Sequence, residues 1–266
     1  MLAADSATGR DSDLLMQAVR EAGGLGLGLS ATELRDGTKN GAAPGTGADM
    51  AVDALIRERL QSATPDYGWL SEESADDSSR LTHRRVWIVD PIDGTRAYLA
   101  GREDWSVSAA LVEDGQPRIA AVFAPASDEF FFATAGGGAT RNGATVAATG
   151  GASFDLSRIA GPPSLLDRMR AHSVNDRGAY RIGSLALRIS RVAQGALDAV
   201  FVGGNSRDWD LAAADLLLRE AGGRLTTLEG KSLRYNRPEV GHHILVGAGR
   251  ERHERLVDHF RSDRVG

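Results

Sequence analysis

An apolar run that stops at two aspartates is the feature that most limits how this chain can fold. Residues 85–89 (RVWIV) have the length and composition of a buried strand, and the sequence D-P-I-D-G-T (residues 90–95) follows directly. The proline fixes a bend and the glycine lets the backbone turn, so Asp90 and Asp93 can converge on one point. Ligands favour the C-terminal ends of strands in open sheets. The sequence therefore predicts a polar site at the end of this strand.

Two carboxylates at one point need a compensating charge. Like charges ~4 Å apart repel by about 4 kcal/mol at an effective dielectric of 20, so either one carboxyl is protonated or a cation lies between them. The chain has no cysteine, and its six histidines form no H-x-x-x-H or H-E-x-x-H motif. The cation that fits is therefore a hard, oxygen-preferring ion such as Mg²⁺. A turn capped by Asp-Pro and Asp-Gly is the plain alternative, and this motif alone favours neither.

Further acidic residues at the ends of predicted elements favour the ion. Glu72 and Glu73 follow a short apolar strand, and Asp49 lies on the inward face of a predicted helix. Asp210 stands at the start of another helix, where the helix dipole favours an ionised carboxylate. Taken singly, these residues are explained as a solvated acidic loop, a surface charge and a helix cap. Together they are unexplained without a common ligand.

Composition sets the broad class of the protein. The 266 residues are enough for a packed core, and no stretch approaches the ~20 apolar residues of a membrane span. The first residues lack the apolar block of a secretory signal. The net charge of −5 is unlike the basic footprint of a protein that binds nucleic-acid polymers, although a small nucleotide remains a candidate ligand. Without cysteine there are no disulfides and no thiolate nucleophile. We therefore expect a cytoplasmic protein with a small-molecule partner and no nucleic-acid or membrane partner.

The pattern of apolar residues divides the chain into two halves. The first half, residues 1–147, is predicted to be α+β, with an antiparallel-looking sheet and two helices. A glycine run at 23–28 interrupts the pattern of the first helix and indicates either close helix packing or a kink. The second half, residues 148–266, alternates strands and helices and is predicted to be α/β. A stretch rich in glycine and proline, residues 36–47, is predicted to be a mobile loop. The predicted helices are 13–34, 48–61, 165–171, 184–196, 209–221 and 251–260, and the strands 67–70, 85–89, 105–112, 118–124, 130–133, 157–160, 197–202 and 243–247.

Five motifs in chain order resemble those of the inositol monophosphatase superfamily of metal-dependent, lithium-sensitive phosphatases. They are T-G-A-D at 46–49, S-E-E-S at 71–74 with Ser71 in place of the family's glycine, D-P-I-D-G-T at 90–95, G-S-L-A-L at 183–187 with V-A-Q-G-A-L-D at 192–198, and W-D-L-A-A at 209–213 with E-A-G-G at 220–223. D-P-I-D-G-T is the most specific of them, and the resemblance covers nearly the whole chain. It implies a layered αβαβα sandwich and leaves a homodimer open.

The resemblance also implies residue roles. Two or three Mg²⁺ ions would be held by Glu72, Asp90, the Ile92 carbonyl, Asp93 and Asp210. The catalytic residues would be Asp49 and Thr95, which orient and deprotonate the attacking water, and Glu72, which shares a weaker third ion. The backbone donors of Gly94 and Thr95 would hold the phosphate. The water would attack phosphorus directly, without a covalent enzyme intermediate.

Two segments indicate the substrate class. Arg96 follows the motif at 90–95, where the family's 3′(2′),5′-bisphosphate nucleotidases carry a lysine, although Ala97 replaces their acidic residue. Residues 233–237 (LRYNR) resemble the nucleotidase pattern L-x-Y-N-K. We therefore predict a phosphatase that removes the 3′-phosphate of 3′-phosphoadenosine 5′-phosphate, yields AMP and clears a by-product of sulfate activation. The predicted substrate contacts are Lys39, Asp93, Gly94, Thr95, Arg96, Ser184, Arg207 and Tyr235. The alternatives are exposed charge for Arg96 and Arg237 and a packed core aromatic for Tyr235.

Other functions fit the sequence less well. Inositol 1-phosphate and fructose 1,6-bisphosphate are the alternative substrates within the superfamily. Haloacid-dehalogenase-type phosphatases also have a strand that ends in aspartates, but one residue separates those aspartates, whereas two separate Asp90 from Asp93. Residues 230–232 (GKS) match the end of a P-loop, but Leu225 stands where its first glycine must be. A catalytically inactive protein that binds metal or nucleotide is the non-enzymatic alternative.

Overall fold

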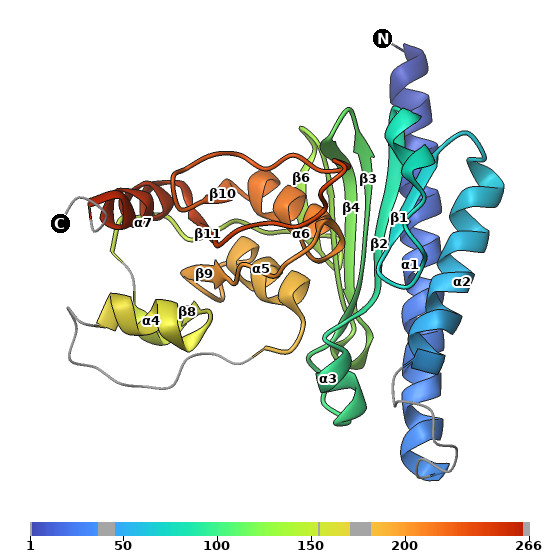
Figure 1. Cartoon of the computed structure of the whole chain (residues 1–266), viewed down its shortest axis with the longest axis horizontal. Coiled ribbons are helices and arrows are strands. Elements are labelled where there is room, and N and C mark those ends of the chain that lie inside the picture. Colours follow the sequence, from blue (N-terminus) through green and yellow to red (C-terminus); the bar gives the residue numbers. More distant parts are fainter. Residues whose placement is uncertain (1, 37–45, 154, 171–181, 263–266) are drawn as a thin grey trace.

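The computed structural model describes residues 2–36, 46–153, 155–170 and 182–262, and it has a layered α/β architecture (Figure 1). A seven-stranded sheet has the order β1-β2-β3-β4-β5-β6-β7, and a four-stranded sheet has the order β10-β11-β9-β8. Two long helices cover one face of the large sheet, two shorter helices lie between the sheets, and the last layer is helical. The predicted αβαβα sandwich is confirmed.

The large sheet is built from consecutive strands. Only β1 and β2 pair in parallel, and every later pair is antiparallel, which matches the predicted sheet except at its first strand. The bounds are β1 Gly68–Ser71, β2 Arg85–Asp93, β3 Ser106–Glu113, β4 Gln116–Ala124, β5 Glu129–Thr134, β6 Gly138–Arg141 and β7 Ala144–Thr145. Strand β2 is buried along almost its whole length because helices cover both of its faces.

Helices α1 (Leu2–Asp36) and α2 (Thr46–Ala63) pack on the outer face of the large sheet. Of the two interpretations of the glycine run, close packing is confirmed and a break in the helix is not, because α1 continues through the run. A side chain at Gly23 would come within 2.4 Å of the Phe123 ring, and one at Gly26 within 2.9 Å of the Trp105 ring. The glycines therefore let the helix lie against the sheet, and this close packing outweighs their poor helix propensity. The predicted loop at 36–47 lies almost wholly outside the described residues.

Helices α5 (Leu185–Ala193) and α6 (Asp208–Glu220) form the layer between the sheets. Residues 211–218 of α6 are all buried, which is typical of a helix surrounded by protein. The small sheet consists of β8 Ile159–Ala160, β9 Ala199–Val202, β10 Gly223–Thr227 and β11 Leu245–Gly249, with α4 Pro163–Arg170 and α7 Arg250–Ser262 outside it. The remaining short elements are α3 Thr95–Leu99 and the 3-10 helices η1 Ser78–Thr82, η2 Pro125–Ser127 and η3 Leu156–Arg158.

Two strands of the small sheet differ from the prediction. Residues 157 and 158 belong to η3, so β8 contains only two residues of the predicted four-residue strand. Strand β10 was not predicted, and its backbone pairs with β11 over its whole length. In the described part of the chain, no helix is both long and apolar enough to cross a membrane. The division into halves at residue 147 stays a prediction.

Candidate active site

The end of β2 brings Asp90 and Asp93 to the same side of the large sheet. In the pairing with β3, Asp90 lies opposite Ser108 and Asp93 opposite Ser106, so two residues of β2 bulge out against one of β3. The bulge corrects the alternation that would otherwise send the two side chains to opposite faces. Both aspartates are buried, with exposed fractions of 1% and 7%.

The turn after β2 requires a glycine. Gly94 has a φ of +93°, a backbone conformation that side chains rarely allow. A Cβ atom there would lie 2.8 Å from the backbone nitrogen of Ser184, so the turn also touches the start of α5. This contact brings the second half of the chain against the end of β2.

The N-terminus of α5 binds the Asp93 carboxylate. Asp93 accepts hydrogen bonds from the Ser184 hydroxyl at 2.6 Å and from the backbone nitrogens of Leu185 at 3.0 Å and Ala186 at 2.6 Å. Burial raises the pKa of Asp93, and these hydrogen bonds oppose the rise. The helix thus fixes the direction of this carboxylate across the boundary between the two halves.

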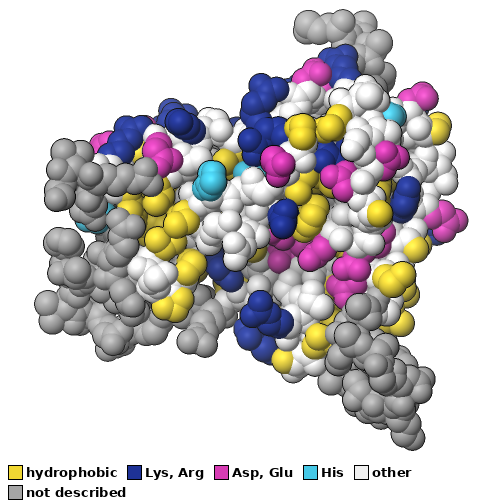
Figure 2. Space-filling view, viewed as in Figure 1, with side chains coloured by type: hydrophobic (Ala, Val, Ile, Leu, Met, Phe, Trp, Pro, Cys, Tyr) yellow, Lys and Arg dark blue, Asp and Glu magenta, His cyan; other side chains and the backbone are white. Residues whose placement is uncertain are grey.

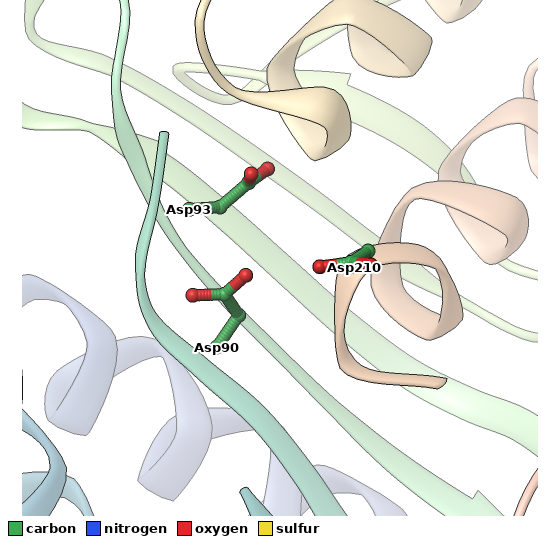
Figure 3. A group of neighbouring side chains, drawn as sticks. All are labelled: Asp90, Asp93 and Asp210. Carbon is green, nitrogen blue, oxygen red and sulfur yellow. The ribbon is translucent and has the colours of Figure 1, made fainter. Parts of the chain in front are cut away.

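Asp210 completes a group of three carboxylates. It lies in the first turn of α6, and its Oδ2 accepts a hydrogen bond of 2.7 Å from the backbone nitrogen of Arg207. One oxygen from each of Asp90, Asp93 and Asp210 lies within 4.8 Å of the others, and the three carboxyl groups face one another (Figure 3). The group therefore joins residues that are 120 positions apart in the chain.

The carboxylates raise one another's pKa. Burial is the main cause, and the charge of Asp93 adds to it: the pKa of Asp90 lies well above its ordinary value and that of Asp210 is raised to about 7. The site holds more negative charge than its surroundings compensate in the absence of a cation.

The residues present fit a divalent metal ion. Oδ1 of Asp90 is buried and has no hydrogen-bond partner in the described structure. Three carboxylates without a thiolate or imidazole form a donor set that suits Mg²⁺ better than zinc or copper. A cation at this point would both satisfy the orphaned oxygen and relieve the repulsion.

Two more acidic residues predicted for the site lie close to this group. Glu72 follows β1, and although the residue is exposed, its charge contributes to the raised pKa of Asp90. Burial of the carboxyl group and the charges of Glu73 and Asp93 raise the pKa of Glu72. Asp49, in the first turn of α2, is 4% exposed, and its charge contributes to the raised pKa of Asp90. Figure 2 shows acidic side chains gathered near the middle of this face, with Lys and Arg side chains beside them.

Thr95 and Ile92 contact each other at the start of α3. The Thr95 hydroxyl donates a hydrogen bond of 3.1 Å to the Ile92 carbonyl oxygen. The two atoms predicted to orient the water and to bind the metal are therefore neighbours. Arg96, the residue after Thr95 in α3, is exposed to solvent.

The residues predicted to contact substrate separate into two groups. Arg207 is exposed and lines a cavity of about 810 Å³ together with Lys231, Arg234 and Arg237. Tyr235, in contrast, is 1% exposed and donates its hydroxyl to Asp215 at 3.0 Å, which matches the alternative of a core aromatic.

Ser184 is fully buried, caps α5 and holds Asp93, so it orients a carboxylate and does not face the cavity. Lys39 lies outside the described residues.

The sequence analysis missed several residues that support the site. The hydroxyl of Ser71 donates to Asp53 on α2, and the hydroxyl of Ser74 donates to the same carboxylate at 2.9 Å, which fixes the turn that carries Glu72. Ser106 hydrogen-bonds Ser184 at 2.8 Å beneath Asp93. Asp53 could have been found, since it lies one helical turn after Asp49, but no local signal pairs it with Ser71.

Comparisons with known proteins agree with this geometry. The family model described as "Inositol monophosphatase family" matches residues 13–264. The chain is 36% identical over 198 residues to a 3′-phosphoadenosine 5′-phosphate phosphatase of Mycobacterium bovis, covering 72% of each chain. It is 38% identical over 214 residues to a histidinol-phosphatase of Mycobacterium tuberculosis, covering 76% of this chain and 81% of the relative.

The crystal structure of the extragenic suppressor protein suhB from Bartonella henselae superposes with a TM-score of 0.79 at 26% identity, covering 94% of this chain and 97% of that one. The sequence match and the shared fold extend over both halves of the chain. The chain therefore belongs to the inositol monophosphatase family.

Proposed function

We propose that this phosphatase uses Mg²⁺ to hydrolyse the 3′-phosphate of 3′-phosphoadenosine 5′-phosphate, releasing AMP and phosphate. The observation that carries the metal requirement is the cluster of Asp90, Asp93 and Asp210, with its raised pKa values and an orphaned buried oxygen. The family is metal-dependent and acts on small phosphate esters. With Glu72 and the Ile92 carbonyl, these aspartates would hold two or three ions.

Bound Mg²⁺ would neutralise the phosphate dianion and make water a stronger nucleophile. The protein's own residues then arrange the reaction. The hydroxyl hydrogen of Thr95 is directed to the Ile92 carbonyl, which leaves the hydroxyl oxygen to accept a hydrogen bond from the attacking water. Asp49 takes the water's proton, and the backbone donors at the start of α3 hold the phosphate. The bond from phosphorus to the ribose 3′-oxygen breaks, and that oxygen takes a proton from solvent to become the 3′-hydroxyl of AMP.

Direct attack by water is tested by the stereochemistry at phosphorus. Single-turnover hydrolysis in ¹⁸O water is expected to place one labelled oxygen in the released phosphate, with inversion of configuration. Net retention would indicate a phosphorylated enzyme and overturn the direct mechanism.

Positive charge beside the cluster supports a substrate with a second phosphate. Arg96 lies two residues after the turn at Gly94, and Arg207 joins the acidic cluster to the cavity of about 810 Å³ through its backbone contact with Asp210. Lys231, Arg234 and Arg237 line that cavity, and among the described residues of its lining Glu239 is the one acidic residue. A bisphosphate nucleotide has the size and the second anion that this surface suits.

The substrate proposal is tested by comparing kcat/KM with Mg²⁺ for 3′-phosphoadenosine 5′-phosphate, inositol 1-phosphate, fructose 1,6-bisphosphate and histidinol phosphate. We expect the nucleotide to be preferred by a factor of about 100 or more, which corresponds to about 2.7 kcal/mol. Similar values for all four would mean that the site recognises only phosphate and metal. No phosphate release from any of them would favour the inactive binding protein.

A variant pair separates the second-phosphate contact from a general effect of charge. Arg96→Ala is expected to raise KM for the bisphosphate nucleotide about tenfold and to change KM for inositol 1-phosphate by less than about twofold. Arg84→Ala is the matched control, because Arg84 is an equally exposed arginine just before the opposite end of β2. Equal effects of Arg96→Ala on both substrates would remove the reason to prefer the nucleotide. Inhibition by Li⁺ is a further expectation from the family.

A further inference from the structure

One buried arginine connects the loop after β1 with the segment after β10. Arg80, in η1, is 1% exposed, and its Nε and Nη2 donate to the two carboxylate oxygens of Asp76 at 2.6 and 2.8 Å. Its Nη1 donates to Oδ1 of Asn236 at 2.7 Å and to the carbonyl of Arg237 at 3.1 Å. A single guanidinium thus binds two segments 156 residues apart in the chain.

The connection continues from Asn236 to the first turn of α6. The side-chain amide of Asn236 donates to the Arg80 carbonyl at 3.3 Å, and its backbone nitrogen donates to Oδ2 of Asp208 at 2.7 Å. Asp208 is fully buried, and its Oδ1 lies 2.7 Å from Nε2 of His242. Asp210 follows two residues later. Hydrogen bonds therefore run from the loop that begins with Glu72 to the helix turn that carries Asp210.

The guanidinium suits this role for a chemical reason. A buried cation is costly unless it is paired and hydrogen-bonded, and Arg80 is paired with Asp76 and donates four hydrogen bonds. Its planar fork fixes the relative direction of its partners, which the point charge of a lysine cannot do. Asn236 has a φ of +54°, so its backbone is held in an uncommon conformation where the contact is made.

We propose that Arg80 is a positioning residue that sets the place of Glu72 relative to Asp210 and thereby the affinity of the site for its metal. The inference rests on the proposed function, because it takes both acidic residues as metal ligands. Arg80 acts through Asp76 and Asn236 and touches neither the substrate nor the reacting atoms. Loss of the Arg80 contacts raises the metal dissociation constant by a larger factor than it lowers kcat at saturating metal.

The test is isothermal titration of the full chain with Mg²⁺ alone, beside the Mg²⁺ dependence of phosphate release. Arg80→Lys is expected to raise the Mg²⁺ dissociation constant about tenfold, while kcat at saturating Mg²⁺ changes by less than about threefold. Asn236→Gly tolerates the positive φ and removes only the side-chain contacts, and a rise of about threefold is expected for it.

Arg191→Lys is the matched control. Arg191, on α5, likewise donates two hydrogen bonds to one carboxylate, through both terminal nitrogens to Glu129 on β5, and connects α5 to the large sheet. Its substitution is expected to lower the melting temperature without changing the Mg²⁺ dissociation constant. This separates a positioning effect from a general loss of stability.

Four outcomes would contradict the inference or its basis. An Arg80→Lys chain with the wild-type dissociation constant overturns it, and so does an equal rise in the Arg191→Lys chain. If Arg80→Lys does not fold, an unchanged constant in Asn236→Gly overturns it. A wild-type chain that binds no Mg²⁺ overturns the proposed function instead.

Discussion

Two groups of buried carboxylates in this protein have opposite electrostatic surroundings. Burial alone would raise the pKa of Glu129, but hydrogen bonds from Arg191, with the charge of Arg141, hold it below its ordinary value. In the cluster of Asp90, Asp93 and Asp210, burial raises the pKa of every member, and repulsion by the charge of Asp93 adds to the rise for Asp90 and Asp210. The same chain can therefore neutralise a buried carboxylate with arginine, and at the end of β2 the repulsion is left standing. A cation bound from solution would remove the repulsion within the cluster.

The largest effect is expected from a substitution within the carboxylate cluster. Asp90→Asn is expected to lower kcat/KM by a factor of about 1,000 or more, because its carboxylate is shared between the proposed ions. The metal-free variant is expected to melt at a higher temperature than the metal-free wild type, since one repulsive charge is gone. Phosphate release and thermal unfolding in EDTA measure the two effects, and more than a tenth of wild-type activity would contradict the assignment.

The next largest effect is expected from a substitution that removes the charge of Glu129. Glu129→Gln is expected to lower the free energy of unfolding by about 1–3 kcal/mol, because the partly exposed Arg141 and Arg191 lose a charged hydrogen-bond partner. Urea unfolding measures this loss. The Mg²⁺ dissociation constant should stay at the wild-type value, and a changed constant would mean that the two groups are coupled.

The raised pKa of Asp210 predicts how the stability of the protein depends on pH. The pKa of Asp210 is raised to about 7 in the metal-free folded chain, so this chain binds more protons than the unfolded chain between about pH 4 and pH 7. Stability of the metal-free protein should therefore fall as pH rises through this range. The increase in melting temperature on adding Mg²⁺ should grow over the same range, because the metal competes with protons. A Mg²⁺ effect equal at pH 5.5 and pH 8 would contradict the raised pKa.

The smallest expected effect concerns Asp53, a buried carboxylate paired with hydroxyl groups instead of arginine. Ser71→Ala removes one of its two serine donors and is expected to lower the free energy of unfolding by about 1 kcal/mol. It should also raise the Mg²⁺ dissociation constant slightly, because Ser71 precedes Glu72. Ser74→Ala serves as the comparison, and a fully neutral result for both would remove Asp53 from the support of the site.

At two places distant residues decide the structure. The glycine run of α1 was expected to mark either close packing or a kink, and the contacts with Phe123 and Trp105 on the sheet decide for close packing in a continuous helix. Strand β10 lacks a strong local pattern and exists through its pairing with β11. Local propensity competes with tertiary contacts in both cases, and the contacts prevail.

The sequence by itself determined the layered α/β class, most of the helices and strands, and the grouping of Asp90 with Asp93. These follow from apolar periodicity and from a bend, a bulge and a glycine turn, which act over a few neighbouring residues. Asp210 was grouped with them only through the family resemblance, and the tertiary structure brings it within reach. Only the tertiary structure buried Tyr235 and Ser184 away from the cavity and joined Arg80 to Asn236. Contacts between residues more than 70 positions apart depend on how whole layers pack, and no local pattern encodes that packing.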